Sequence, residues 1–325
     1  MKVTHGISRR AALSAMAALG LGCSKRPRGA GFAIGYVNNL TNAQPLVANV
    51  RGTWARELGA ELVAFPAGPA VMEALTAGSI DAGFLGPSAI VNAHVRSGGK
   101  RLRVLSGAAS GGASLVVRKG LPIAKKPDDL RGRTVTASQI GSTPDVALRG
   151  WLHDAGVRST DLGGDVRIVP MPNTEANELL RRGKLDAVWA QEPWASRMVA
   201  AGAVRCFDER ELWPNGRFPT VLLVASTKAL AADPSRVSAL VRLHEAETGR
   251  LSAAGDAARD EVSAALAKAL GKALAPATFA DAWSRFTLTT DRDEAGLARV
   301  ARSMRAIGYV PDGGLDGLFA PREAA

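Results

Sequence analysis

The sequence predicts an α/β fold made of two similar halves, and three observations carry that prediction. Short apolar runs of strand length alternate with helical stretches along most of the chain. One motif occurs twice, as AGSIDAGFLGPSA at 77–89 and as RGKLDAVWAQEPWA at 182–195, so that Asp81 and Asp186 correspond. The 325 residues are 46% hydrophobic but only 5% aromatic, which suits close packing of helices on sheets in two domains of ordinary size.

The first half alternates strands and helices whose ends are marked by proline and glycine. Pro69 and Pro87 stand at expected helix starts, and Gly78 follows an expected helix end. Strands are expected at 31–37, 61–68 and 79–86 and twice within 101–120, with helices from Pro45, at 69–78 and from Pro87 to Gly99. This alternation predicts a parallel sheet of right-handed βαβ units, in which the repeated aspartates shape the turns that enter two strands.

The middle of the chain repeats this scheme, and the tail is helical. Strands are expected at 130–138, 165–171, 184–191, 203–209 and 218–227, with helices within 141–156, 173–183 and 192–202. Amphipathic, Ala-rich stretches predict further helices at 234–250, 257–271 and 294–306. A repeat with only two copies excludes a solenoid, which needs at least three.

Residues 1–30 are expected to be an export signal followed by a polar tether. Arg9 and Arg10 precede an apolar run of about eleven residues, which is too short for a bilayer span but typical of the core of a signal. Ser8-Arg9-Arg10 resembles a twin-arginine signal, and Gly22-Cys23 resembles the end of a lipobox, whose cysteine is lipidated. The export route stays open, and so does cleavage without lipidation at Cys23.

Composition argues against several classes of function. Of the net charge of +11, six positive charges lie before residue 29, and no basic stripe with interleaved aromatics follows, so nucleic-acid binding is not expected. If Cys23 is lipidated or removed, Cys206 has no partner for a disulfide, and it is expected to be a small buried residue on a strand. The four histidines are scattered without metal-ligand spacing. Nucleophile-elbow and phosphate-loop motifs do not occur, so no metal, cofactor or catalytic residue is expected.

The candidate site lies where strands of an open α/β sheet lead into helices, since ligands bind at that edge. Four loops are expected there: NNLTNAQ, GPS at 86–88, SQIGSTP at 138–144 and AQEPW at 190–194. Hydroxyls, side-chain amides and helix-start backbone amides in these loops favour an anion site at a helix N-terminus. The best candidate is GSTPDVAL, in which Ser142 or Thr143 caps the helix and Pro144 is its first residue.

Three further residues near the second copy of the motif have open interpretations. Glu192 is interpreted either as a carboxylate in the first turn of a helix, where it interacts favourably with the helix dipole, or as a general base. Trp189 and Trp194 fit the core or the wall of the cleft, and stacking of either one on a ligand is left open.

Five blocks occur in order between about residues 31 and 235, namely AVMEALTAGSIDAGFLGPSAIVNA, GASLVVRK, DLRGRTVTASQIGSTPDVALRGWLHDAGV, NTEANELLRRGKLDAVWAQEPWAS and ELWPNGRFPTVLLVAS. They resemble the extracytoplasmic substrate-binding proteins of ABC importers, in the group for aliphatic sulfonates, taurine and nitrate. The resemblance implies a two-lobed, type II periplasmic-binding-protein-like fold with two parallel-type sheets, hinge strands and a central ligand cleft. Lobe one would be 31–113 plus 225–325 and lobe two 114–224, with crossings near Gly111–Ser114 and Thr220–Ala225.

The resemblance also implies a mechanism and a set of contacts. A small ligand would select the closed state of the hinge, and the closed form would be presented to the membrane subunits of an ABC permease. Ser88 from lobe one and Ser142 with Thr143 from lobe two would hold a sulfonate group. The implied ligand-binding residues are Asn42, Gln44, Gly86, Ser88, Gly141, Ser142, Thr143, Glu192 and Trp194. The protein would be periplasmic or at the cell surface, anchored to the membrane if Cys23 is lipidated.

Several alternatives remain at this point. The cleft loops carry no conspicuous Arg or Lys, which is compatible with an anion bound by amides and equally with a neutral heterocycle such as a pyrimidine. A ligand-sensing subunit that docks on a membrane receptor is a second alternative. An enzyme of pyrimidine synthesis on the same fold is less favoured, because such an enzyme is expected to lack an export signal.

Overall fold

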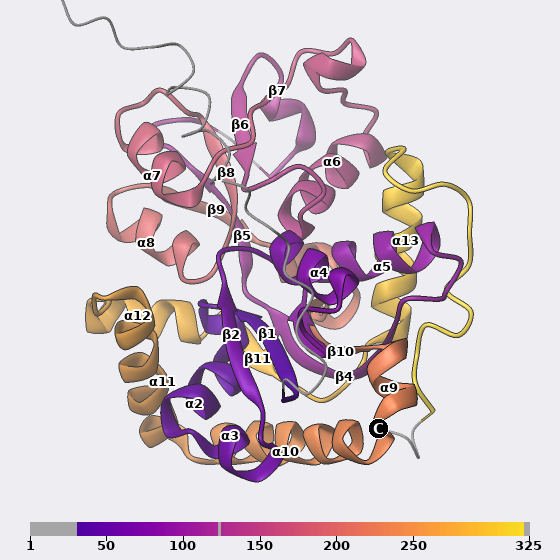
Figure 1. Cartoon of the computed structure of the whole chain (residues 1–325). Coiled ribbons are helices and arrows are strands. Elements are labelled where there is room, and N and C mark those ends of the chain that lie inside the picture. The colour runs from indigo at the N-terminus through magenta and orange to yellow at the C-terminus, as the bar shows by residue number, and fades with distance from the viewer. Residues whose placement is uncertain (1–30, 123–124, 322–325) are drawn as a thin grey trace, which may run out of the picture. The chain divides into compact units, whose positions relative to one another are not determined.

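A computed structural model describes residues 31–122 and 125–321 (Figure 1). The expected export signal, the tether and Cys23 lie outside the described residues. Within the described ranges, no helix combines the length and the apolar character needed to cross a membrane.

The first sheet has six strands in the order β11-β4-β10-β3-β1-β2. Its strands are β1 (Ala33–Val37), β2 (Glu61–Phe65), β3 (Ala82–Leu85), β4 (Leu102–Gly111), β10 (Pro219–Ser226) and β11 (Phe286–Leu288). β1 runs parallel to β2 and β3, with Ile34 opposite Ala82. β10 is antiparallel to both β3 and β4, and β11 is antiparallel to β4.

The second sheet has five strands in the order β7-β6-β8-β5-β9. Its strands are β5 (Ala113–Val117), β6 (Thr134–Ala137), β7 (Arg167–Ile168), β8 (Ala187–Gln191) and β9 (Val204–Asp208). β6 is parallel to β7 and β8, whereas β5 is antiparallel to β8 and β9. The elements packed around the two sheets are called below the first-sheet half and the second-sheet half.

Helices cover both faces of each sheet (Figure 1). In the first-sheet half they are α2 (Ala43–Arg51), α3 (Thr53–Leu58), α4 (Gly68–Ala77), α5 (Pro87–Arg96), α9 (Thr227–Ala232), α10 (Pro234–Ala253), α11 (Gly255–Leu270), α12 (Pro276–Trp283) and α13 (Glu294–Ala306). In the second-sheet half they are α6 (Thr143–Asp154), α7 (Asn173–Arg181) and α8 (Trp194–Ala200). The connections include short 3₁₀ turns: η1 (Leu40–Asn42), η2 (Pro127–Leu130), η3 (Thr160–Leu162), η4 (Glu209–Leu212) and η5 (Pro214–Gly216).

The chain passes from the first sheet to the second at two glycines. Gly111 and Gly112 have φ values of 85° and 82°, a left-handed conformation that favours glycine. A Cβ on Gly112 would also lie 3.0 Å from the Cβ of Phe286. The chain returns before Pro219, because β10 pairs only within the first sheet, so Thr220–Ala225 is not the crossing that was expected there.

The predicted α/β fold with two sheets is confirmed, but the sheets are mixed rather than parallel. The reason is that β10 runs antiparallel to its neighbours β3 and β4, and β5 runs antiparallel to its neighbours β8 and β9. Two short elements of the tail, α12 and β11, were not predicted. α13 packs against α6 and α12 packs against α8, so the C-terminal part of the first-sheet half contacts the second-sheet half on two sides (Figure 1).

The repeated motif has the same structural role in both halves. Asp81 Oδ2 accepts the backbone N–H of Ala33 at 2.9 Å, and Asp186 Oδ2 accepts that of Thr134 at 2.9 Å. Ala33 and Thr134 are the first residues of β1 and β6, the parallel neighbours of β3 and β8. Each aspartate therefore fixes the start of two adjacent strands, which confirms that these residues shape strand entry.

Candidate functional site

A cavity of about 190 Å³ lies between the two halves, lined by residues of both. Six helices begin at its wall. The residues at or just before these helix starts that line the cavity are Asn42 (α2), Gly68 (α4), Gly86 (α5), Ser142 (α6), Asn173 (α7) and Trp194 (α8). First-turn N–H groups have no acceptor inside their own helix, and the dipole makes each helix start partly positive. The convergence therefore produces a positive potential without a charged side chain.

The start of α6 is organised by one serine and one buried aspartate. Ser142 is the N-cap, and its Oγ accepts the N–H of Asp145 at 3.4 Å. The Asp145 carboxylate in turn accepts the N–H of Gly141 at 2.8 Å, which fixes the loop before the helix. The prediction that this segment is a capped helix start is confirmed, although Thr143 is the first residue and Pro144 the second.

Ser88 and Thr143 bring the two halves together at the cavity. Their hydroxyl oxygens are 3.2 Å apart, although the residues belong to α5 and α6 of different halves. Gly86 permits this approach, since a Cβ on it would lie 2.5 Å from Thr143 Oγ1. Gly86, Ser88, Gly141 and Thr143 all line the cavity, as their expected role requires.

The loop after β1 contributes some of the residues expected and some that were not. Asn42 lines the cavity, and its side-chain amide donates to Asn39 Oδ1 at 2.6 Å. Asn38 and Asn39 line the cavity as well but were not selected from the sequence, although they stand in the same NNLTNAQ loop. The Oδ1 atom of Asn38 is buried and has no hydrogen-bond partner within the described residues.

Gln44 does not line the cavity, contrary to its expected role as a ligand contact. Its side chain is 0% exposed and donates to the carbonyl of Ala108 at 2.8 Å and to Thr248 Oγ1 at 3.1 Å. The residue stands on the face of α2 that packs on β4 and α10, so helix geometry turns it into the core.

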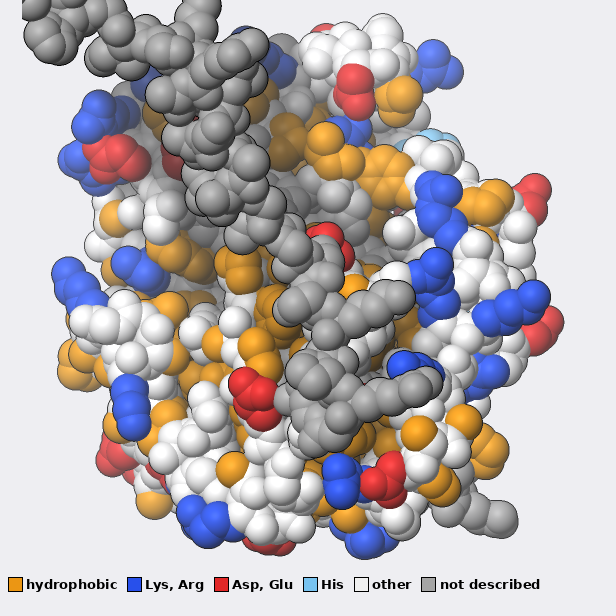
Figure 2. Space-filling model, in the orientation of Figure 1, with side chains coloured by type: hydrophobic (Ala, Val, Ile, Leu, Met, Phe, Trp, Pro, Cys, Tyr) orange, Lys and Arg blue, Asp and Glu red, His pale blue; other side chains and the backbone are white. Residues whose placement is uncertain are grey.

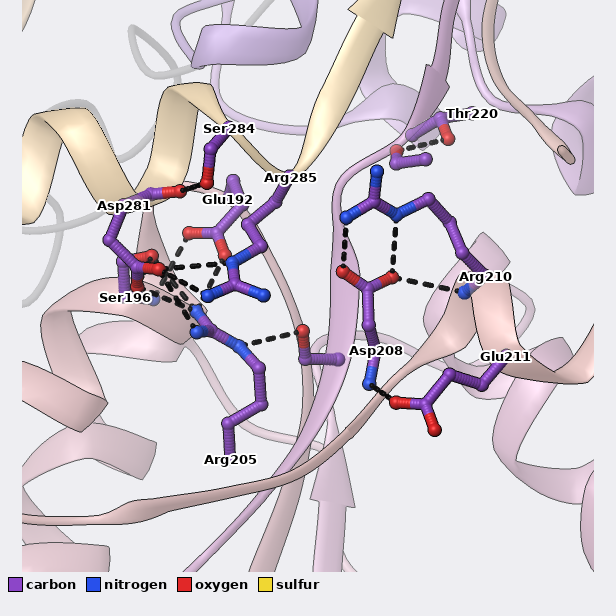
Figure 3. A network of polar contacts seen from close by, with 12 residues as sticks. Glu192, Ser196, Arg205, Asp208, Arg210, Glu211, Thr220, Asp281, Ser284 and Arg285 are labelled. Carbon is purple, nitrogen blue, oxygen red and sulfur yellow. Dashed lines mark hydrogen bonds and ion pairs between the residues drawn. The ribbon is translucent and has the colours of Figure 1, made fainter. Parts of the chain in front are cut away.

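Glu192 lines the cavity, but its carboxylate is engaged in a network beside it (Figure 3). One oxygen accepts the N–H of Ser196 at 3.0 Å, and the other accepts Arg205 Nη2 at 3.1 Å. Arg205 also contacts Asp281 of α12 at 2.9 Å. Burial raises the pKa of Glu192, while the Ser196 amide and Arg205 lower it. The contact with the Ser196 amide places this carboxyl at the first turn of α8, as the first-turn interpretation expects, and both of its oxygens have partners in the network.

The two tryptophans of the second motif have different surroundings. Trp189 is 1% exposed, and its indole N–H donates to Glu209 Oε2 at 2.7 Å, so it is a core residue. Trp194 lines the cavity and carries the guanidinium of Arg197 on its ring at 4.1 Å.

Charge and metal ligands are both sparse at this site. Glu192 is the only charged residue among the described residues that line the cavity. Over the described ranges, no group of three or more His, Cys, Asp or Glu side chains could hold a metal ion. Lys and Arg side chains are dispersed among neutral and acidic ones on the face shown in Figure 2. Cys206 lies on β9, is partly exposed rather than buried, and forms no disulfide with another described residue.

Comparison with known proteins gives a family and a fold. The model of the NMT1-like family matches residues 26–267. A candidate binding protein of Brucella abortus (strain 2308) is 24% identical over 222 residues, which are 67% of this chain and 66% of that protein. The chain therefore spans slightly less than two thirds of the length of that relative.

Two proteins of Escherichia coli carry names that state a ligand. The taurine-binding periplasmic protein of strain K12 is 27% identical over 173 residues, 52% of each chain. The crystal structure of the periplasmic aliphatic sulphonate binding protein superposes with a TM-score of 0.68 at 22% identity, covering 86% of this chain and 94% of that one. The fold is that of the periplasmic binding proteins, and none of these three neighbours is named as an enzyme.

Proposed function

The chain belongs to the NMT1-like family, and on that premise we propose that it is an extracytoplasmic solute-binding protein of an ABC importer. Its cavity would bind a small anion, such as an aliphatic sulfonate, taurine or nitrate. Two of its neighbours carry names that fit this class of ligand.

The observation that carries the proposal is the convergence of helix N-termini from both halves on one cavity. Five of these helices, α2, α4, α5, α6 and α7, have nine residues or more, enough for a full dipole at the start. The N-caps of α4 and α5, Ala67 and Gly86, make no side-chain capping hydrogen bond, which leaves first-turn amides for a ligand. An oxyanion bound by such amides needs no arginine or lysine, and the cavity lining has neither.

The size of the cavity fits a ligand with few atoms. Sites for drug-sized molecules occupy roughly 300–1,000 Å³, whereas this cavity measures about 190 Å³. A sulfonate or nitrate group with a short organic part is of the right order.

We assign the working motion to the connections between the halves. The first-sheet half and the second-sheet half would rotate about those connections, with 219–224 moving with the first because β10 pairs only within the first sheet, and the ligand would contact both halves only in the closed state. The closed form would deliver the ligand to the membrane subunits of the permease. Export to the periplasm, with Cys23 as a lipid anchor, completes this proposal.

A thermal-shift panel tests the ligand class. The chain is titrated with alkanesulfonates, taurine, nitrate and bicarbonate, and with a neutral pyrimidine as the alternative ligand. A ligand at a hundred times its dissociation constant stabilises the folded state by about 2.7 kcal/mol. Stabilisation by at least one anion is the expected result. A shift with the pyrimidine alone would replace the anion with the neutral alternative.

A pair of cap variants locates the binding site within that panel. In the double variant Ser142→Ala with Thr143→Ala, the anion-induced shift is expected to disappear, because the start of α6 loses its ordered hydroxyls. Ser226→Ala is the matched control, since Ser226 caps α9 by accepting the N–H of Ala229 at 3.0 Å and does not line the cavity. Equal loss of the shift in both variants would contradict the location.

A further inference from the structure

A second concavity adjoins the cavity on the side of the second-sheet half. It measures about 650 Å³ and lies between α7 and α8 on one side and the segment joining α11 to α12 on the other. We call it the outer groove and define it by Asn177, Trp194, Arg197, Leu270, Lys272 and Leu274. Its lining is otherwise made mostly of alanine and threonine.

The outer groove differs from the cavity in its charge. It contains two cationic side chains, Arg197 and Lys272, and no acidic residue among the described residues that line it. Neither cation has a carboxylate partner within the described parts of the chain. At the C-terminal end of the adjacent α7, by contrast, Arg181 and the following Arg182 are both paired with Glu178, at 2.9 and 2.5 Å.

Arg197 is held in a defined place although it has no ion pair. Its guanidinium stacks on the ring of Trp194, 4.1 Å from the centroid. A cation stacked on an indole keeps its charge and its N–H donors, because the ring face contacts only the flat side of the guanidinium. The donors at the edge of the guanidinium therefore remain available for a ligand.

Trp194 connects the two spaces, because it lines both the cavity and the outer groove. A ligand whose head occupies the cavity has this indole as the side wall on the way to the groove. Beyond it, Leu270 and Leu274 offer apolar contact to a carbon chain, and Lys272 and Arg197 offer positive charge.

We propose that the outer groove binds a second negatively charged group of the ligand. The ligand class would then be an anion with two charged ends joined by an apolar spacer. The head group would bind at the helix starts, the spacer along Trp194, and the distal group at Arg197 and Lys272. This inference rests on the proposed function, because it assumes an anionic head in the cavity.

Matched pairs of monoanions and dianions test it by isothermal titration calorimetry on the purified chain. The pairs are alkanesulfonates with α,ω-alkanedisulfonates, and alkanoates with α,ω-dicarboxylates, at spacers of two, four and six carbons. For at least one spacer the dianion is expected to bind about tenfold more tightly, as one partly exposed charge-assisted contact allows. In Arg197→Gln with Lys272→Gln this preference should vanish, while the affinity for the monoanion stays within about twofold.

Two further variants control for charge and for packing. Arg181→Gln with Arg182→Gln removes the same number of positive charges, two, at residues that do not line the outer groove, and it should leave the preference for dianions intact. Arg197→Lys keeps the positive charge but loses the planar donors. It should retain part of the preference for dianions that the double Gln variant loses.

Each outcome bears on the inference. Equal binding of monoanion and dianion at every spacer would overturn it and leave the proposed function standing. An equal loss of affinity for monoanions and for dianions in the double variant Arg197→Gln with Lys272→Gln would also overturn it. The groove would then only attract anions toward the cavity. Binding of no anion at all would overturn the proposed function and this inference together.

Discussion

The two copies of the repeated motif share the residue that begins the strands and differ in the residues that face the cavity. Asp81 and Asp186 accept the first N–H of the neighbouring strand at the same distance, 2.9 Å. After the strand, the first copy presents Gly86 and Ser88, which permit contact with the other half, whereas the second presents Trp194. The shared part of the motif thus begins the strands, and the residues that face the cavity belong to the part that diverged.

Each half also buries an ionisable group whose pKa is shifted strongly toward the neutral form, and the two groups differ in kind. In the first-sheet half, His244 is 0% exposed, its Nε2 is 2.6 Å from the carbonyl oxygen of Gly107, and burial lowers its pKa to about 4. In the second-sheet half, Glu209 accepts the indole N–H groups of Trp189 and Trp213, and burial raises its pKa to about 7. Both shifts favour the neutral form, so the two halves should respond to pH in opposite directions.

The largest predicted effect is on the pH dependence of stability. His244 stays neutral in the folded state while the unfolded chain takes up a proton below its ordinary pKa of 6.5, so stability falls as the pH drops from 6.5 toward 4. Glu209 keeps its proton when folded while the unfolded chain loses it above 4.5, so stability falls as the pH rises from 4.5 toward 7. Each shift corresponds to about 3 kcal/mol at 1.36 kcal/mol per pKa unit.

Chemical denaturation between pH 4 and 8 measures both effects. His244→Gln should flatten the loss of stability on the acidic side, and Glu209→Gln should flatten the loss toward neutral pH. The difference between each variant and the unchanged chain removes the contribution of other groups. Variant curves that run parallel to that of the unchanged chain would contradict the prediction.

The second prediction tests whether the two motif aspartates are equivalent. Replacing either by alanine leaves a strand-start N–H without its acceptor, which costs about 1–3 kcal/mol. Asp81→Ala and Asp186→Ala should therefore each lower the free energy of unfolding by about this amount, with up to about 1 kcal/mol more for Asp186, which also pairs with Arg118 at 2.9 Å. Asp128→Ala is the control, because Asp128 pairs with Arg131 on the exposed surface, where an ion pair contributes little, and this variant should be the mildest of the three. If Asp81→Ala or Asp186→Ala lowered the free energy of unfolding no more than Asp128→Ala does, the two copies of the motif would be similar in sequence without a shared structural role.

Local signals predicted the elements of the fold better than they predicted the direction of side chains. Pro87 and Gly78 marked helix ends correctly, because their backbone preferences act locally. The three-residue strand β11 carries too little pattern to be recognised, and the reversed direction of β10 follows from pairing with β4 over more than a hundred residues. The four loops at the ends of the strands were predicted for the same local reason, and residues of all four line the cavity.

Within those loops, tertiary packing decides which way a residue points. Gln44 is polar and next to the loop, yet its helix turns it toward Ala108 and Thr248. Glu192 is drawn to Arg205, which stands on a different strand. Arg197 was overlooked because nothing in its local sequence shows that no carboxylate will face it.

The smallest predicted effect compares the two tyrosines of the chain, Tyr36 and Tyr309. The hydroxyl of Tyr309, which follows α13, donates to Asp145 Oδ2 at 2.6 Å, and the same carboxylate holds the N–H of Gly141 at the cavity. This bond therefore joins the first-sheet half to the loop before α6 in the second-sheet half. The hydroxyl of Tyr36 instead accepts from Asn49 at 2.8 Å within one half.

Tyr309→Phe should weaken ligand binding about fivefold to tenfold, mainly through faster dissociation, because a bond worth about 1–1.5 kcal/mol no longer holds the halves closed. Tyr36→Phe should cost similar stability and leave affinity within about twofold, because its bond does not change when the halves move. Stopped-flow dissociation of a bound anion, with denaturation of both variants, separates the two cases. Equal effects on dissociation would mean that the contact between Tyr309 and Asp145 stabilises the fold without coupling it to the ligand.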